Sequence, residues 1–298
     1  MKQRTVNEYL KEKYGKKLYK VSINAGFSCP NRDGTLERRG CIFCSEGGSG
    51  EFAGSPAQSI TEQIGDGKKR VLKKLPKGDF GLIAYFQAFT NTYAPVDTLR
   101  RLYFEALRHP EVEILSIATR PDCLSDEVLE LLAECNRIKT VWVELGLQTV
   151  HERTAKYIRR GYDLSVYDAA VRRLRERGLE TIVHVILGLP GESREDMLQT
   201  VEYVGKSGAT GIKLQLLHVL KNTDLAKEYE AGKFECLSME EYVSLVKDAC
   251  EVLPDNIVIH RMTGDGDKKL LIAPTWSEDK KRVLNALRQF VIENQDAT

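Results

Sequence analysis

The sequence lacks the features that would place this protein in or across a membrane. No apolar run approaches the ~18 consecutive residues that a membrane-spanning helix needs. Residues 1–20 carry positive charge, but no apolar stretch follows them, which is not the pattern of a signal peptide. We therefore expect a cytoplasmic protein that has no membrane partner.

The chain also lacks a strong net charge. Its 44 Lys and Arg residues against 43 Asp and Glu residues leave a formal net charge of +1. A nucleic acid would therefore have to be bound by local basic patches rather than by overall attraction. Basic residues do gather in four segments, although such clusters are usually solvated surface. These segments are 11–20, 68–74, 172–177 and 280–282.

No Pro/Gly/Ser-rich linker, low-complexity tract or internal repeat divides the 298 residues, a length that a single α/β barrel commonly reaches. Seven short apolar runs recur, and several are nearly continuous, which is typical of parallel strands that are buried on both faces. These runs are 20–27, 80–87, 113–120, 140–148, 181–189, 211–220 and 256–262. Helical patterns separate them, as at 96–109 and 164–177, so the sequence predicts an α/β fold.

We expect a partial (β/α)6-type TIM-like barrel of parallel strands over residues 1–265. Residues 266–298 would form a C-terminal extension with a terminal helix at about 277–294. In barrels of this kind the working side chains follow the carboxyl ends of the strands. Residues at those positions that can do chemistry are therefore the candidates for a functional site.

Three cysteines lie close together in the chain, directly after the first predicted strand. Cys29, Cys41 and Cys44 have the spacing Cys-x11-Cys-x2-Cys. Disulfides are not expected, because the total of seven cysteines is odd and a cytoplasmic chain is kept reduced. Structural zinc commonly takes two ligand pairs, and the sequence has no second Cys-x2-Cys or His-x3-His pair. Ordinary buried thiols and zinc remain the alternatives to an iron–sulfur cluster with one iron left open.

These cysteines carry a resemblance to the radical S-adenosylmethionine superfamily, because Cys41 to Cys44 read Cys-x-aromatic-Cys with Phe43 as the aromatic residue. The commonest spacing in that superfamily separates the first two cysteines by three residues, whereas the longer gap here resembles the Elp3-like branch. Within that branch the chain is similar to the YtqA-type (MnmL) subgroup over about residues 1–265. The motifs that occur in order are CPNRDGT, GCIFC, YFQAFTNTYAP, ATRPDCL, ELGLQT, RRGYD and HVILGLPGE.

The resemblance implies an enzyme whose three cysteines hold a [4Fe–4S] cluster and whose open iron binds S-adenosylmethionine. Reductive cleavage of that cofactor releases a 5′-deoxyadenosyl radical, which abstracts hydrogen from the substrate. The subgroup implies action on tRNA, in which carboxymethylaminomethyl-uridine at the wobble position is converted towards aminomethyl-uridine. A flavodoxin or ferredoxin would supply electrons. The alternatives are a radical enzyme acting on another nucleic acid or small molecule, and a non-catalytic zinc-binding interaction protein.

The same resemblance implies which residues bind the cofactor. Polar residues end the second strand, where the family usually has a Gly-Gly-Glu-like stretch that this chain lacks. Glu144 would face the barrel interior, although pairing with an arginine is the alternative for a carboxylate in an apolar strand. One of two adjacent arginines would meet the cofactor carboxylate, and a glycine would lie near adenine. The expected cofactor-binding residues are Phe43, Gln87, Thr90, Asn91, Thr92, Glu144, Gln148, Arg159, Arg160 and Gly188.

Residues at the ends of later strands are candidates for the substrate side. They are Arg120, Asp122, His218 and Arg261. We expect an arginine such as Arg120 or Arg261 to hold a substrate carboxylate. The radical would take hydrogen from the carbon between nitrogen and carboxylate, and loss of an electron would then give an imine that water converts to the free amine.

Overall fold

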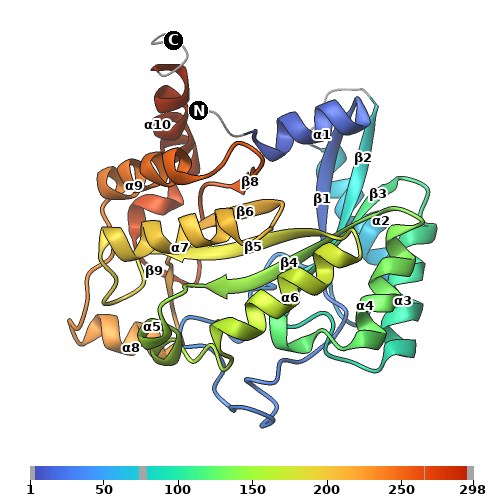
Figure 1. The fold of residues 1–298 in the computed structure, drawn as a ribbon, viewed down its shortest axis with the longest axis horizontal. Coiled ribbons are helices and arrows are strands. Elements are labelled where there is room, and N and C mark those ends of the chain that lie inside the picture. The colour runs from blue at the N-terminus through green and yellow to red at the C-terminus, as the bar shows by residue number, and fades with distance from the viewer. Residues whose placement is uncertain (1–3, 74–78, 265, 294–298) are drawn as a thin grey trace.

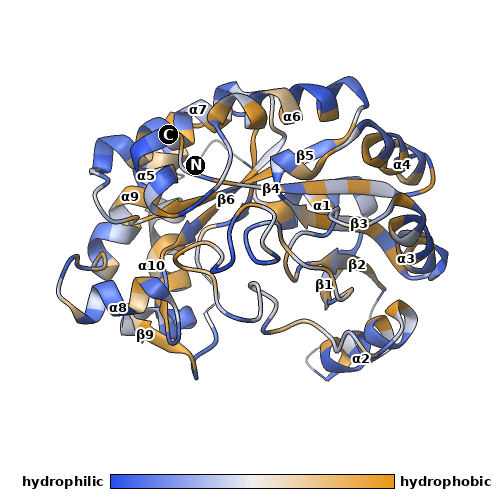
Figure 2. Ribbon diagram, turned by 90° about the horizontal axis from the view of Figure 1, so that it is seen from below, coloured by the Kyte–Doolittle hydropathy of each residue, from blue (hydrophilic) through white to orange (hydrophobic). Residues whose placement is uncertain are grey.

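The computed structural model describes residues 4–73, 79–264 and 266–293, with only the backbone described beyond residue 287. Its main sheet has seven parallel strands in the order β1-β2-β3-β4-β5-β6-β8 (Figure 1). The strands are β1 Lys17–Ile23, β2 Phe80–Phe86, β3 Val112–Thr119, β4 Thr140–Gln148, β5 Glu180–Leu187, β6 Gly211–Leu216 and β8 Val258–Arg261. Each lies within or overlaps one of the seven predicted runs. The sheet curls into an arc (Figure 2), so the predicted partial barrel is confirmed.

Helices cover the outer face of this sheet. They include α2 Ile60–Leu72, α3 Val96–Arg108, α4 Asp126–Asn136, α6 Leu164–Glu176, α7 Arg194–Lys206 and α9 Met239–Val252. Four of them begin at a serine whose hydroxyl accepts a backbone N–H of the first turn, which satisfies a donor that the helix leaves unpaired. Apolar residues of the outer sheet face pack against these helices and form the largest core cluster of the described residues.

The remaining elements close the ends of the barrel. Helix α1 Val6–Tyr14 packs at the amino ends of the strands, against β1 and β8. At the opposite side lie α5 Glu152–Tyr157, α8 Asp224–Glu230 and a small antiparallel sheet of β7 Val219–Leu220 and β9 Leu271–Ala273. The C-terminal helix α10 spans Lys280–Glu293, and two short 3-10 helices span Pro121–Cys123 and Thr275–Glu278. In the part of the chain that the structure describes, no helix is both long and apolar enough to span a membrane.

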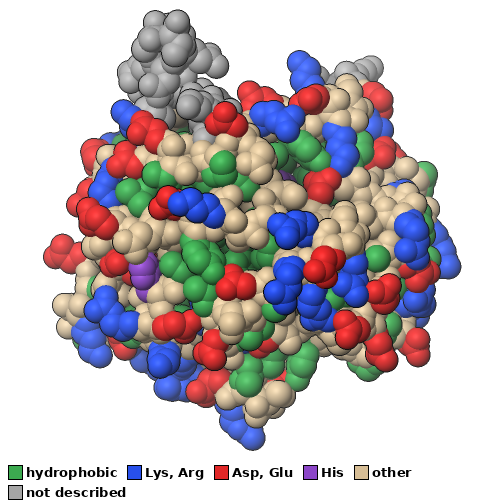
Figure 3. All heavy atoms as spheres, viewed as in Figure 1, with side chains coloured by type: hydrophobic (Ala, Val, Ile, Leu, Met, Phe, Trp, Pro, Cys, Tyr) green, Lys and Arg blue, Asp and Glu red, His purple; other side chains and the backbone are tan. Residues whose placement is uncertain are grey.

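Charged side chains of both signs are interspersed on the face shown in Figure 3. That pattern matches the nearly neutral net charge of the sequence. One predicted surface cluster nevertheless needs a correction, because Lys20 does not lie on a solvated face. Its ammonium group reaches inward from β1 to the buried carboxylate of Glu144, at 3.1 Å.

Inward-pointing side chains are stacked in layers, because alternate residues of a strand point to opposite faces. Strand β4 shows the pattern, since Trp142, Glu144, Gly146 and Gln148 face the interior while the intervening residues face the helices. The lowest layer is apolar and contains Leu18, Ile83, Ile114, Trp142 and Ile182. The layer above it is polar and contains Lys20, Tyr85, Ser116, Glu144, His184 and Lys213. This polar layer is the floor of a cavity at the carboxyl ends of the strands.

Candidate functional site

The three clustered cysteines line one side of that cavity. Cys29, Cys41 and Cys44 belong to a segment, residues 24–59, that contains neither helix nor strand and connects β1 to α2. The segment holds its shape through polar contacts rather than through secondary structure. The Asn31 amide donates to the Cys41 sulfur at 3.4 Å, and the Arg32 guanidinium donates to the Cys44 carbonyl at 2.9 Å.

The environment of the thiols fits a bound iron–sulfur cluster. Burial, together with the neighbouring thiolates of Cys44 and Cys29, raises the pKa of Cys41 to about 11. Three thiolates this close need a bound cation to remain ionised. A [4Fe–4S] cluster supplies that positive charge, since each thiolate binds a separate iron.

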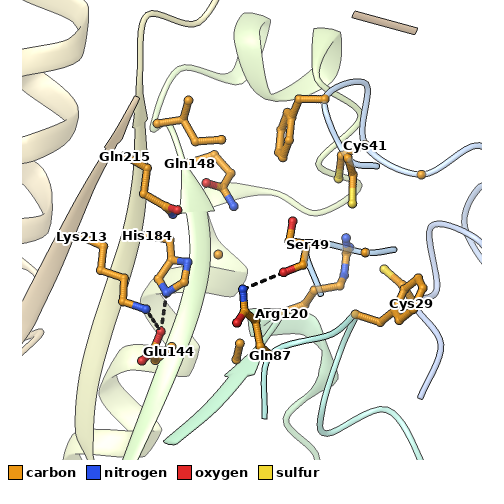
Figure 4. Close-up of a pocket in the computed structure, with 18 of the residues that line it drawn as sticks. Cys29, Cys41, Ser49, Gln87, Arg120, Glu144, Gln148, His184, Lys213 and Gln215 are labelled. Carbon is orange, nitrogen blue, oxygen red and sulfur yellow. Dashed lines mark hydrogen bonds and ion pairs between the residues drawn. The ribbon is translucent and has the colours of Figure 1, made fainter. Parts of the chain in front are cut away.

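Six of the ten expected cofactor-binding residues line the cavity. They are Phe43, Gln87, Thr90, Glu144, Gln148 and Arg160. Gln87 extends from the end of β2 and donates to the Ser49 carbonyl at 2.7 Å, which ties the strand end to the cysteine segment (Figure 4). Gln148 has a buried side-chain oxygen without a protein partner, as expected of a group that awaits a ligand.

Asn91 and Thr92 lie outside the cavity lining and hold the backbone in place. The Asn91 amide donates to the Ala118 carbonyl at 2.9 Å, and the Thr92 hydroxyl donates to the Cys123 carbonyl at 2.6 Å. Both side chains are buried. They connect the loop after β2 to the end of β3, so their observed contacts are with the protein scaffold.

The two candidate arginines near Gly161 already have protein acceptors. Arg160 is 2 % exposed and donates to the carbonyls of Tyr162 and Thr149 and to the Glu152 carboxylate. Arg159 lies outside the cavity lining, and its guanidinium contacts Asp224 at 2.8 Å. Each guanidinium therefore has an acceptor other than a cofactor carboxylate.

Gly188 also lies outside the cavity lining, at the end of β5. Its φ of +92° is one that residues with a Cβ rarely adopt, and its N–H points at the Met197 sulfur, 2.9 Å away. An added Cβ would lie 3.3 Å from the Leu237 side chain. The glycine is thus required by the turn from β5 into α7.

Among the substrate-side candidates, Arg120 lines the cavity and Asp122 does not. The Arg120 guanidinium is buried and forms a two-point contact with the Asp122 carboxylate, at 2.9 and 2.8 Å. It also lies 5.3 Å from the ring centre of Tyr162. Asp122 therefore orients Arg120, and this contact occupies two of the donors that would bind a substrate carboxylate.

His218 and Arg261 also line the cavity. Burial, together with the positive charges of Lys280 and Arg261, lowers the pKa of His218 to about 4. Its buried Nε2 has no protein partner. A Cβ on Gly264 would lie 2.4 Å from the imidazole ring, so the loop can cover His218 closely only because this residue is glycine.

Glu144 accepts hydrogen bonds from residues on four other strands. Ser116 and His184 donate to it at 2.7 Å each, Lys20 contacts it at 3.1 Å, and Lys213 also reaches it. Burial alone would raise the pKa of Glu144, but the charges of Lys20 and Lys213 hold it well below its ordinary value. The alternative for Glu144, pairing with an arginine, is therefore wrong, because its cationic partners are two lysines.

Sequence reasoning missed Lys213 as a candidate. The signal was available, because Lys213 is a charged residue within the predicted apolar run 211–220, where a cation without a partner is costly. It missed Arg32 and Tyr162 as well, which line the cavity from segments without strands. Both positions fall within motifs that carry the family resemblance, CPNRDGT and RRGYD, but neither was named as a site residue.

Comparisons with known proteins agree with this geometry. A sequence model described as the radical SAM superfamily matches residues 34–204, and one described as the Radical_SAM C-terminal domain matches residues 209–292. The chain is 48% identical over 285 residues to the uncharacterized protein YtqA of Bacillus subtilis, covering 96% of this chain and 88% of that protein.

Two more distant similarities are a partial sequence match and a structural match. A tRNA uridine(34) acetyltransferase of Methanocaldococcus infernus is 26% identical over 155 residues, which cover 51% of this chain and 28% of that protein. The solved structure of Elp3 from Methanocaldococcus infernus matches with a TM-score of 0.66 at 16% identity. That match covers 92% of this chain and 63% of that chain, and at this identity it shows a shared fold.

Proposed function

The chain belongs to the radical S-adenosylmethionine superfamily, and on this basis we propose that it modifies the wobble uridine of tRNA. As an enzyme of this class it uses a [4Fe–4S] cluster and S-adenosylmethionine. The proposed reaction converts carboxymethylaminomethyl-uridine towards aminomethyl-uridine. The observation that carries the proposal is the partial similarity to a tRNA uridine(34) acetyltransferase, together with the ordered motifs of the YtqA-type subgroup.

Cys29, Cys41 and Cys44 would hold the cluster at one side of the cavity. When bound, the cluster and S-adenosylmethionine supply a 5′-deoxyadenosyl radical that removes hydrogen from the substrate. Gln87, Thr90 and Gln148 offer hydrogen-bonding groups to the polar end of the cofactor. They lie at the carboxyl ends of strands, where barrel enzymes place such groups.

Other residues would exclude water from the cavity. Ile158 and Leu217 are buried, Ile186 is nearly so, and all three line the cavity within the second core cluster. Apolar walls of this kind protect a reactive species from solvent. Arg261, which lines the cavity, would offer a positive charge to the substrate carboxylate. A flavodoxin or ferredoxin would deliver the electron.

The first test concerns the enzyme class. Anaerobically purified protein should contain about four irons per chain, as a [4Fe–4S] cluster requires, and should release 5′-deoxyadenosine when given dithionite and S-adenosylmethionine. The Cys41→Ala variant should lose both properties. Zinc in place of iron, with no cofactor cleavage, would overturn the proposal in favour of a zinc-binding protein.

The second test concerns the substrate. tRNA bearing carboxymethylaminomethyl-uridine is deuterated at the carbon between nitrogen and carboxylate and given to the reconstituted enzyme. We expect deuterium in 5′-deoxyadenosine and aminomethyl-uridine in the tRNA. Cofactor cleavage without transfer of deuterium would agree with the enzyme class but would contradict the proposed substrate.

A further inference from the structure

We propose that Lys213 is the proton acceptor of the reaction, through an ε-amine that is uncharged in the resting enzyme. The inference rests on the proposed function for its substrate. The state of the amine itself can be measured without any substrate.

Glu144 is surrounded by more positive charge than one carboxylate can balance. Its side chain is fully buried and lies in contact with two ammonium groups, those of Lys20 and Lys213. One carboxylate balances one ammonium. A second ammonium would leave an uncompensated charge in the barrel interior, which is costly. One of the two amines is therefore expected to release its proton.

The surroundings identify Lys213 as the amine that does so. Its side chain is 3% exposed, whereas that of Lys20 is 28% exposed and keeps part of its hydration. The ring of Tyr85 lies 4.6 Å from the Lys20 ammonium and 4.7 Å from that of Lys213, but only Lys20 also lies over Trp142. Loss of the proton is easier for the more deeply buried amine.

The groups that face Lys213 come from each neighbouring part of the sheet. They are Lys20 on β1, Tyr85 on β2, Glu144 on β4, His184 on β5, and His260 and Arg261 on β8. Burial lowers the pKa of Lys213 well below its ordinary value even though Glu144 acts in the opposite direction. The positive charges of Lys20 and Arg261 add to the lowering.

The position of Lys213 suits contact with a substrate. Lys213 lines the same cavity as the three cysteines, and Lys20 does not. In Figure 4, Lys213 and His184 both point to Glu144 on one side of the cavity, while Cys29 and Cys41 lie on the other. A substrate between them would meet the radical chemistry on one side and the amine on the other.

The balance of the proposed reaction requires such an acceptor. Conversion of R–NH–CH2–COO⁻ and water to R–NH2 and glyoxylate releases two electrons and two protons. S-adenosylmethionine takes up both electrons and one proton as it is split into methionine and 5′-deoxyadenosine. One proton therefore remains, and it must leave the substrate nitrogen or the attacking water within a cavity that excludes bulk solvent.

His184 is the other candidate acceptor in this layer. Burial lowers the pKa of His184 to about 4, and its Nε2 is bonded to Glu144 at 2.7 Å. Its imidazole is therefore a weak base. We assign His184 the role of holding the Glu144 carboxylate in place.

The test compares pH profiles of aminomethyl-uridine formation under single turnover. In the wild type the rate should rise with pH as Lys213 loses its proton, below the ordinary lysine value of about 10.4. Lys20→Met should move this rise to higher pH, because it removes a positive charge that favours the neutral amine.

The Lys213→Met variant should form aminomethyl-uridine about 100-fold more slowly or worse. Its rate should no longer rise with pH, while 5′-deoxyadenosine still forms. Amine formation by Lys213→Met within about threefold of the wild type, or a profile that Lys20→Met leaves unmoved, would overturn the inference.

A second measurement does not depend on substrate. Lysine labelled with ¹³C at Cε is incorporated into the holoenzyme, and the Lys213 signal is assigned by its absence in Lys213→Arg. A signal that titrates at least one pH unit below ordinary lysine supports the inference, and an ordinary titration overturns it. If the wild type forms no aminomethyl-uridine at any pH, the proposed function fails and this titration alone decides the state of Lys213.

Discussion

Buried ionisable side chains determine the character of this site at the scale of single residues. Glu144 is 1% exposed, and an unpaired carboxylate at that depth would be strongly unfavourable. Its four donors remove that penalty, and they also fix the positions of His184 and Lys213 beside the cavity. A single strand residue therefore organises the polar floor on which the proposed proton transfer depends.

The lowered pKa values of the buried histidines allow us to predict how the free energy of unfolding changes with pH. The pKa of His184 is lowered from 6.5 to about 4 in the folded protein. Between these values the unfolded chain binds more protons than the folded chain, so the free energy of unfolding falls as pH decreases from about 6.5 to about 4. The shift corresponds to a loss of up to about 3 kcal/mol from this residue.

Urea unfolding at several pH values between 7 and 4 measures this loss. The His184→Gln variant should show a shallower decrease than the wild type. The decrease should not vanish, because the pKa of His218 is also about 4. Parallel curves for the two proteins would show that His184 titrates normally.

At the scale of elements, helix α2 shows how closely a helix can approach the sheet. Two glycines, Gly65 and Gly67, lie within it and lower its intrinsic helix propensity. Its start was nevertheless recognisable, since Ser59 and Glu62 form a capping box at the first turn. A Cβ on Gly67 would lie 2.2 Å from the Val21 side chain, so this glycine allows α2 to pack on β1.

The two glycines make a matched pair of substitutions. Gly67→Ala should destabilise the protein by about 1–3 kcal/mol, because the added methyl group overpacks the contact with β1. Gly65→Ala has open space around its Cβ and should stabilise the protein by about 0.4–1 kcal/mol. Chemical denaturation of both variants tests this contrast. Equal effects from the two substitutions would contradict the close approach of α2.

At the scale of the whole molecule, the cysteine segment is separate from the frame that supports it. The seven-stranded sheet and its helices share one large apolar cluster, and none of the three cysteines belongs to that cluster. Residues 24–59 instead depend on turns and polar contacts. The frame should therefore keep its fold whether or not a metal cluster is bound.

Removal of the cluster by oxidation and chelation tests this separation. The far-ultraviolet circular dichroism spectrum should change little, because the secondary structure lies outside the segment. Limited proteolysis should cut the protein without its cluster preferentially within residues 24–59. The protein with the cluster bound should resist cleavage there. Loss of helical signal, or first cuts within the strands, would show that the cluster supports the whole fold.

The sequence by itself determined the features that reside in contiguous residues. Apolar runs specified the seven parallel strands, because a strand buried on both faces is apolar along most of its length. The spacing of Cys29, Cys41 and Cys44, with the ordered motifs, was enough to indicate the family. Such patterns are local, so the chain displays them without folding.

Only the tertiary structure decided which polar side chains meet. Lys20, Ser116, His184 and Lys213 converge on Glu144 because the sheet curls and its strands are staggered, so residues distant in sequence come to the same height in the barrel. The same curl placed Arg120 at the cavity and left Arg159 outside it. Which side chains pair with a buried charge depends on this three-dimensional arrangement. The sequence pattern along a single strand does not reveal those partners.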